Sequence, residues 1–300
     1  MIYAEIPYGS RLGNWMFIYA VAMSTGEPVS LCEVEESVSS LFDKYQDVFG
    51  GIRLRSGVPT GVSKYYEPHF NYTPIPVRKG EDLHIKGYFQ SEKYFNESLV
   101  RKLFQITSAR KKELLAKYGD WLNRPDVTGI SVRRGDYLKV GYYLPFVGKK
   151  YLKHAVDKFR ASGVRDFIVC SDDQEWCKRF FVGKPFEGLN FKFIECESVL
   201  NQLYIHSLCK NNIISNSSFS WWGAWLNEHS SKRVIAPSQW FGFAFEGGSE
   251  AWGDIYFKGT EVLANGYSVG QWLVARYYWY LGRMKRWLVL QIKKWRGWCT

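Results

Sequence analysis

Two adjacent arginines are the residues of this sequence best suited to chemistry on a phosphate. Arg133 and Arg134 directly follow a predicted strand at 127–132, and Gly135 and Asp136 come next. A guanidinium is a planar fork of donors that matches the oxygens of a phosphate, so two of them at the end of a strand indicate a phosphate-binding site. The alternative is a structural ion pair between an arginine and Asp136.

Two carboxylates occupy a similar place further along the chain. Asp172 and Asp173 follow the apolar run 166–170. At the end of a strand they could accept hydrogen bonds from a ribose or from the edge of a guanine. An aspartate in this position also caps a following helix, and the sequence leaves both alternatives open.

Small polar residues open a third segment, which runs into a tryptophan-rich stretch. Its candidate ligand-binding residues are Asn216, Ser218, Phe219 and Ser220. Backbone amides and hydroxyls at the start of a helix bind phosphate without a charged side chain. The alternative is a capped helix whose tryptophan-rich face is buried.

The segments after residue 125 alternate between strand and helix patterns. Strands separated by helices pair in parallel, and such a sheet binds ligands at the carboxyl ends of its strands. We therefore predict a Rossmann-like domain at 126–265 that follows a first domain at 1–125. The predicted strands are 127–132, 166–170, 191–195 and 212–214, and the predicted helices are 151–161, one from about 174, 200–209 and 220–226.

The first domain has a weaker pattern. A glycine loop that contains Gly13 and Asn14 joins a predicted strand at 2–6 to a predicted helix at 14–23. Its spacing differs from the Gly-x-Gly-x-x-Gly dinucleotide fingerprint, so the loop alone predicts no ligand. A helical stretch is predicted at 97–118.

The composition is that of an ordinary folded protein. Of 300 residues, 46% are hydrophobic and 23% are charged, which excludes a disordered or collagen-like chain. The formal net charge is +11, but seven basic residues and no acidic one fall in 271–300. The remainder is only mildly basic, which argues against a surface that follows a nucleic acid.

Residues 266–300 are predicted to form a basic, amphipathic helical tail. At about 100° per residue, the apolar side chains of 271–298 gather on one arc and the basic residues lie outside it. The stretch holds five tryptophans, which is typical of a helix that binds an anionic membrane surface. The alternatives are docking on the body of the protein or on a second copy.

No signal peptide, spanning segment or metal site is predicted. We expect a cytoplasmic protein that is peripheral on the inner face of the plasma membrane. The cysteines at 32, 170, 177, 196, 209 and 299 form no Cys-x-x-Cys pair and have no zinc-finger spacing, so they are interpreted as reduced core thiols. The sequence does not indicate an oligomeric state.

Taken together, these segments resemble the bacterial α-1,2-fucosyltransferases. The glycine loop with 14–17 is similar to the family's Gly-Arg-Leu-Gly-Asn-Gln-Met-Phe opening, and 133–137 is similar to its His-x-Arg-Arg-x-Asp signature. Two positions depart from the pattern, because Ser131 replaces the leading His and Trp15 replaces the Gln. The middle and C-terminal blocks of the family are matched by 87–95, 208–226 and 234–237.

The resemblance implies an inverting GT-B glycosyltransferase with two Rossmann-like domains. It would move L-fucose from GDP-fucose to the 2-hydroxyl of a galactoside in a surface glycan. Arg133 and Arg134 would stabilise charge on the β-phosphate, a role that a metal fills in transferases with an Asp-x-Asp motif, so no metal or other cofactor is expected. The donor-binding candidates are Gly13, Asn14, Asp172, Asp173, Asn216, Ser218, Phe219 and Ser220.

The base that takes the proton of the acceptor hydroxyl is left open. Asp136 is the carboxylate nearest to the arginines, and Glu92 and His69 are weaker candidates. The alternative functions are transfer from a GDP-sugar with another acceptor or linkage and, more distantly, non-enzymatic binding of a glycan or nucleic acid. For a catalytic function, no nucleic-acid partner is expected.

Overall fold

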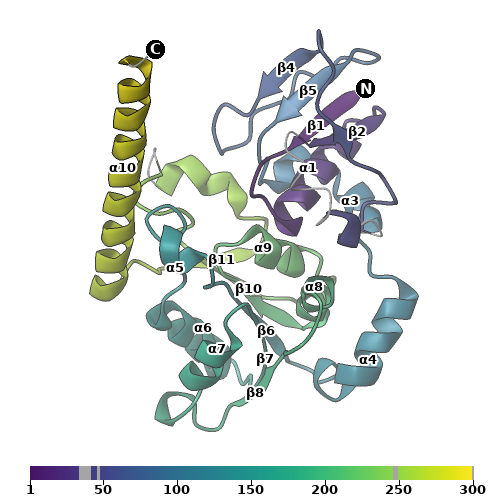
Figure 1. Cartoon of the computed structure of the whole chain (residues 1–300). Helices are drawn as coiled ribbons and strands as arrows, with labels where there is room; N and C mark the ends of the chain where they lie inside the picture. The colour runs from purple at the N-terminus through teal and green to yellow at the C-terminus, as the bar shows by residue number, and fades with distance from the viewer. Residues whose placement is uncertain (34–41, 46–47, 246–248, 299–300) are drawn as a thin grey trace.

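The chain folds into two α/β units. The computed structural model describes residues 1–33, 42–45, 48–245 and 249–298. It holds two parallel sheets flanked by helices, one above the other in Figure 1. The expected fold with two Rossmann-like units is confirmed. The division of the chain at residue 125 stays a prediction.

The first unit has a five-stranded sheet in the order β3-β2-β1-β5-β4, with all pairs parallel. The order reverses between β1 and β5, so the loops that follow these two strands emerge together at one edge. The elements are β1 (Ile2–Ile6), α1 (Leu12–Ser24), β2 (Val29–Glu33), η1 (Asp43–Tyr45), β3 (Arg55–Ser56), β4 (Ser63–Tyr66), β5 (Leu83–Lys86), η2 (Glu92–Tyr94), α3 (Glu97–Leu103) and α4 (Ser108–Leu122).

The second unit has a six-stranded sheet in the order β11-β10-β9-β6-β7-β8, also with all pairs parallel. This is the doubly wound order of nucleotide-binding sheets, with its switch point between β6 and β9. The elements are β6 (Thr128–Val132), α5 (Tyr137–Val140), α6 (Lys149–Ala161), β7 (Asp166–Ser171), α7 (Gln174–Phe180), η3 (Lys184–Phe186), β8 (Asn190–Phe193), α8 (Val199–Leu208), β9 (Asn211–Ile213), α9 (Ser218–Trp225), β10 (Val234–Pro237), η4 (Ser249–Ile255) and β11 (Thr260–Leu263).

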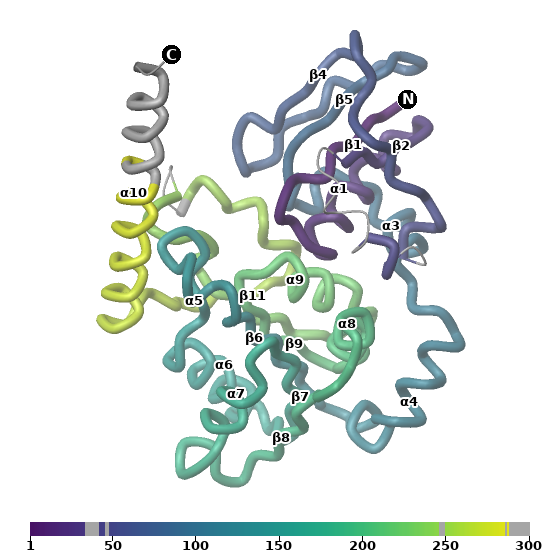
Figure 2. Tube along the Cα trace, in the orientation of Figure 1, coloured from purple at the N-terminus to yellow at the C-terminus, as the bar shows by residue number. Residues whose placement is uncertain are grey.

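The predicted helix at 97–118 is two helices in the structure. Helix α3 ends at Leu103, and α4 begins after Thr107, whose hydroxyl accepts a hydrogen bond from the backbone N–H of Arg110. A threonine cap of this kind starts a new helix because its side chain satisfies a free amide of the first turn. Helix α4 then carries the chain along the outer edge of the molecule from the first unit to the second (Figure 2).

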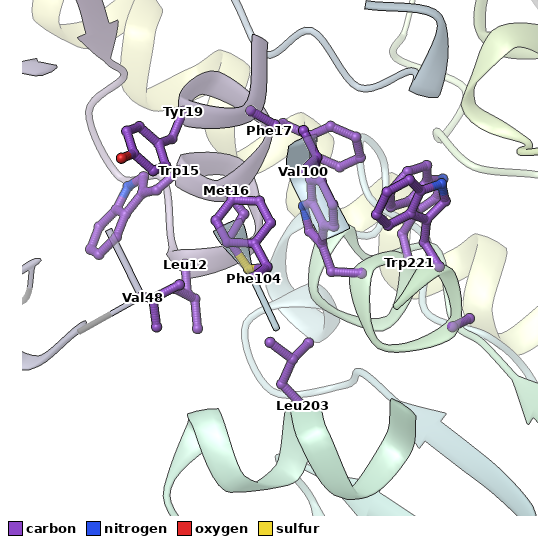
Figure 3. Packing of buried hydrophobic residues seen from close by; sticks show 14 of the residues in the cluster. Leu12, Trp15, Met16, Phe17, Tyr19, Val48, Val100, Phe104, Leu203 and Trp221 are labelled. Atoms are coloured by element: carbon purple, nitrogen blue, oxygen red, sulfur yellow. The ribbon is translucent and has the colours of Figure 1, made fainter. Parts of the chain in front are cut away.

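One hydrophobic core joins the two units. Helix α1 is apolar nearly all round, as expected for a buried helix, and packs against α9 of the second unit. The ring centroid of Phe17 lies 4.6 Å from that of Trp221 and 4.7 Å from that of Trp222. Figure 3 shows this junction, with Leu203 of α8 facing it. The relative position of the two sheets is thus set by close packing.

The basic tail forms a long helix, α10 (Val269–Trp298), that packs beside α5. Its contact face includes Ala275, which is 2% exposed, and Gln271, whose amide donates to the carbonyl of Phe146 (3.1 Å). The apolar residues on another face point to solvent, among them Leu273, Met284 and Trp287, which are 56%, 58% and 59% exposed. No described helix has the length and apolarity that a membrane span requires.

The interpretation of the cysteines as core thiols holds for four of them. Cys32, Cys170, Cys177 and Cys209 are buried and free. Cys196 is free but exposed, because it lies in the turn after β8 with a positive φ of 57°. Cys299 lies outside the described residues.

Candidate active site

A cleft of about 520 Å³ lies between the loops of the two units. Its size is in the range of small-ligand sites. The first unit contributes the glycine loop after β1, and the second contributes the loops after β6 and β7 and the start of α9. Seven of the predicted site residues line it, namely Gly13, Asn14, Arg133, Asp136, Asp172, Ser218 and Phe219.

Arg133 is the cation that the second sheet presents to this cleft. It directly follows β6 at the switch point, and its guanidinium is held at 2.7 Å by Asp136 and at 2.8 Å by Asp172. The side chain remains 32% exposed. The two carboxylates fix the fork at the edge of the cleft, where an anionic group can reach it.

Arg134 lies outside the cleft lining. Its side chain is 10% exposed, its Nε is 3.1 Å from a carboxylate oxygen of Asp173, and its guanidinium lies 3.9 Å above the ring of Trp176. The other oxygen of Asp173 accepts from the backbone N–H of Trp176 and caps α7. Arg134 and Asp173 therefore form a structural ion pair, and Asp173 also caps a helix. This geometry fits the structural alternative for these residues and not the ligand-binding one.

The start of α9 lines the same cleft as Arg133. Ser217, Ser218 and Phe219 line the cleft there, and no described side chain caps the helix. Uncapped amides at a helix start attract an anion. Asn216 and Ser220 lie behind this wall, where the amide of Asn216 donates to the carbonyl of Trp240 (2.8 Å) and the hydroxyl of Ser220 pairs with that of Ser215 (2.9 Å). Both side chains are 1% exposed.

The glycine loop of the first unit touches the same helix start. A Cβ at Gly13 would lie 2.5 Å from the backbone nitrogen of Phe219, and the indole of Trp222 donates to the Gly13 carbonyl (2.9 Å). Next to it, Asn14 accepts a hydrogen bond from the side chain of Gln90 (2.7 Å). Only glycine fits at position 13, so this glycine of the loop is required by the packing of the loop against α9.

The two departures from the family pattern have different locations. Ser131 lines the cleft and is 5% exposed, so the residue that replaces the histidine is part of the cleft wall. Trp15 is fully buried, packs against Phe42 and Tyr45, and donates from its indole to the hydroxyl of Ser10 (2.8 Å). Trp15 is therefore a core residue that holds the glycine loop through its hydrogen bond to Ser10.

The three candidate bases differ in position. Asp136 lines the cleft with one oxygen on Arg133. Glu92 accepts from the indole of Trp225 (3.0 Å) and from the backbone N–H of Lys258 (2.8 Å), which ties the two units together away from the cleft. His69 is exposed and lies outside the cleft lining.

The cleft-lining residues that the sequence did not predict include three with polar side chains, Arg11, Tyr137 and Gln202. Burial raises the pKa of Tyr137, whose hydroxyl donates to the carbonyl of Asn216 (3.1 Å). Arg11 lies between the glycines of the loop and Tyr137 follows Asp136, so their neighbours could have indicated them. Gln202 lies inside α8, where no sequence signal distinguishes it. Within the described residues, no group of three or more His, Cys, Asp or Glu side chains could hold a metal ion.

Fold and site together define an α/β protein with two Rossmann-like units and a cleft between their carboxyl edges. Residues 64–252 match the family described as glycosyl transferase family 11, and this match covers more than half of the chain. The chain belongs to glycosyl transferase family 11.

Two curated relatives come from Escherichia coli. The chain is 30% identical over 213 residues to the O-antigen biosynthesis glycosyltransferase WbnK, which covers 65% of each protein. It is 35% identical over 160 residues to an alpha-1,2-colitosyltransferase, which covers 52% of this chain and 55% of that protein. The chain thus spans less than two thirds of the length of these relatives.

Two solved structures are similar to this fold at low sequence identity. POFUT1 in complex with GDP-fucose has a TM-score of 0.46 and 11% identity, over 78% of this chain and 97% of that chain. NodZ alpha-1,6-fucosyltransferase soaked with GDP-fucose has a TM-score of 0.46 and 13% identity, over 75% of this chain and 91% of that chain.

Proposed function

We propose that this protein is an inverting glycosyltransferase that moves L-fucose from GDP-fucose to the 2-hydroxyl of a galactoside in a surface glycan. Membership of glycosyl transferase family 11 supports the reaction class. The observation that carries the proposal is the cleft itself, which Arg133 and the uncapped start of α9 both line. This arrangement suits a diphosphate next to a sugar.

In the proposed reaction, the bond between fucose and the β-phosphate breaks as the acceptor hydroxyl attacks from the opposite face. Negative charge grows on the leaving diphosphate, and groups that stabilise this charge more in the transition state than in the ground state speed the step. Arg133 and the first-turn amides of α9 would do this without a metal. Asp136 and Asp172 would hold the guanidinium in place, and the base remains unassigned.

A second donor is supported by one relative. The alpha-1,2-colitosyltransferase of E. coli is 35% identical over the aligned part, so a GDP-linked sugar other than fucose is the second candidate. Transfer to another acceptor or linkage uses the same cleft and the same leaving group.

The test is a transfer assay with GDP-fucose and GDP-colitose on a panel of galactosides, with and without EDTA. We expect fucose transfer that survives EDTA, and GDP alone should raise the melting temperature, since a ligand at a hundred times its Kd stabilises by about 2.7 kcal/mol. Transfer from GDP-colitose alone would show that GDP-colitose, and not GDP-fucose, is the donor. Activity lost in EDTA and restored by Mn²⁺ would overturn the metal-free step, and no effect of GDP would overturn the function.

We further propose that α10 binds an anionic membrane surface, which would bring the protein to membrane-linked glycan acceptors on the inner face. The exposed apolar face with Leu273, Met284 and Trp287 supports this, because these side chains lie away from the contact that α10 makes with the body. The stretch is also basic without any acid. Such a helix lies in a membrane interface with its cations near anionic headgroups.

A further inference from the structure

The carboxyl edge of the first sheet carries a half-buried carboxylate, that of Glu67, which the proposed reaction has not used. Glu67 directly follows β4, and the loop 87–90 directly follows β5, the strand beside it. Because β5 also pairs with β1, this loop emerges beside the glycine loop of the cleft. The switch point of a parallel sheet is where ligands bind.

The loop 87–90 is built around the Glu67 side chain. Its carboxylate accepts from the backbone N–H of Tyr88 (2.7 Å) and of Phe89 (3.0 Å). A Cβ at Gly87 would lie 2.5 Å from the Cβ of Glu67, and Phe89 has a φ of +49°, a left-handed conformation that costs energy in a non-glycine residue. The carboxylate thus holds a strained turn in one conformation.

This turn carries one side chain that contacts a cleft residue and one that joins an aromatic cluster between the two units. Gln90 donates to Asn14, which lines the cleft. Tyr88 is 36% exposed and meets Phe70, which packs against Phe241 of the second unit. Tyr143 contacts the same Phe241 and directly precedes Leu144, a cleft-lining residue. This aromatic cluster, with Tyr88 and Tyr143 36% and 42% exposed, therefore reaches the cleft through Leu144, and tyrosine rings combine an apolar face with a polar edge.

We propose that Glu67 is the positioning residue of the acceptor side, because it fixes the turn that presents Tyr88 and Gln90 to a galactoside. The inference rests on the proposed transfer to a galactoside. The sugar would lie across Tyr88, with its reactive hydroxyl toward the donor in the cleft.

The ionisation of Glu67 should make acceptor binding depend on pH, which a side chain with only a packing role would not do. Burial raises the pKa of Glu67 to about 7, and the two backbone hydrogen bonds lower it by less. The titratable groups that interact with it are Tyr65, Tyr88 and Tyr94, whose pKa values are raised, so they stay neutral at pH 6 to 8. Below pH 7 the carboxyl gains a proton, and the neutral group is a weaker acceptor for the two backbone N–H groups than the carboxylate.

The sign for stability is the opposite of that for activity. The folded pKa lies above the ordinary value of 4.5, so the stability that protonated Glu67 contributes is present at low pH and is lost as the pH rises through about 7. At pH 8 the half-buried carboxylate of Glu67 is charged, and its two backbone hydrogen bonds hold the loop 87–90. Glu67→Gln removes this charge and should leave the melting temperature at pH 8 equal or higher.

The experiment measures kcat and KM for the galactoside in Glu67→Gln and Tyr88→Ala, together with GDP affinity and hydrolysis of GDP-fucose without acceptor. We expect the acceptor KM to rise on the order of tenfold in both variants, which corresponds to one lost contact of about 1.4 kcal/mol. GDP affinity and donor hydrolysis should stay unchanged. In the wild type the acceptor KM should rise as the pH falls from 8 to 6, and in Glu67→Gln it should not.

The control is Glu81→Gln, which removes an exposed acid ahead of β5 whose carboxylate lies 3.7 Å from exposed Arg78. It should match the wild type in all four readouts. An unchanged acceptor KM in both variants of an active protein, or a weaker affinity for GDP, would overturn the inference and leave the proposed function standing. A wild type that neither binds GDP nor hydrolyses GDP-fucose would overturn the proposed function itself.

Discussion

At the scale of single residues, the structure separates two arginines that the sequence treats alike. Successive side chains at the end of a strand point to opposite sides of the sheet, so Arg133 reaches the cleft and Arg134 lies over Trp176. We expect Arg133→Ala to lower kcat for transfer on the order of a hundredfold or more with little change in melting temperature. Arg133→Lys should restore little, because an ammonium lacks the planar fork. Near wild-type kcat in Arg133→Ala would exclude a role in leaving-group stabilisation.

Arg134→Ala is the matched comparison for that prediction. It removes a guanidinium that is stacked on Trp176 and paired with Asp173, so the main effect should be on stability. A desolvated cation–π contact contributes about 2 kcal/mol, and thermal unfolding should show a loss of this order. A large loss of kcat with unchanged stability would restore the catalytic role that the sequence suggested for this residue.

Charged residues that follow a recognisable strand could be predicted from the sequence. Residues whose role depends on partners far away along the chain could not. Arg133 and Asp172 were found because each follows a segment that was predicted as a strand. Glu67 follows β4, a short and largely exposed strand that shows no clear alternation. Its partners lie more than twenty residues away, so only the fold reveals them.

At the scale of elements, the same reason explains why the second unit was predicted better than the first. Strands β6 and β7 are almost wholly buried, as strands of a parallel sheet covered on both faces are, and their predicted bounds differ from the structure by one residue. Strands β2 to β5 were not predicted, because strands of two to five residues with interspersed polar side chains are too short to show a period. Strand β11 was missed as well, being one of these short strands.

Helix α10 gives a prediction at this scale. Truncation would also remove the contact of Gln271 and Ala275 with the body, so substitution of the exposed face is the sharper test. We expect the protein to float with anionic vesicles at low salt. The double substitution Leu273→Glu with Met284→Glu should prevent flotation, because it removes apolar side chains that would enter the membrane interface and adds negative charges that the anionic headgroups repel. Activity on a soluble galactoside should be unchanged.

The control for α10 makes the same change at exposed apolar sites elsewhere, Val182→Glu with Val262→Glu. This variant should float like the wild type. If the wild type does not float with vesicles, the membrane proposal fails. If the α10 variant floats like the wild type but no longer forms dimers, the exposed face of α10 binds a second copy, and the membrane proposal fails as well.

At the scale of the whole molecule, the two units act as one body because a shared core and polar contacts hold them together. Helices α1 and α9 pack across the junction, and Asp254 of the second unit pairs with Lys93 of the first at 2.5 Å. The sequence could place the glycine loop and the tryptophan-rich helix on separate domains, but not against each other. Their contact depends on the crossing of two helices that are some two hundred residues apart.

Gly13 is the position where this arrangement is most easily tested. In Gly13→Ala, the new methyl would meet the backbone of Ser218 and Phe219 at 2.7 and 2.5 Å, and backbone atoms cannot move aside as a flexible side chain can. Overpacking of this kind costs about 1–3 kcal/mol, so the melting temperature should fall. Because the same contact forms the cleft wall, GDP affinity should fall on the order of tenfold or more. Gly266→Ala, at an exposed glycine with open space around it, should change neither property. If Gly13→Ala loses stability but binds GDP as the wild type does, the glycine loop joins the two units without shaping the donor site, and the donor would then be held by the second unit alone.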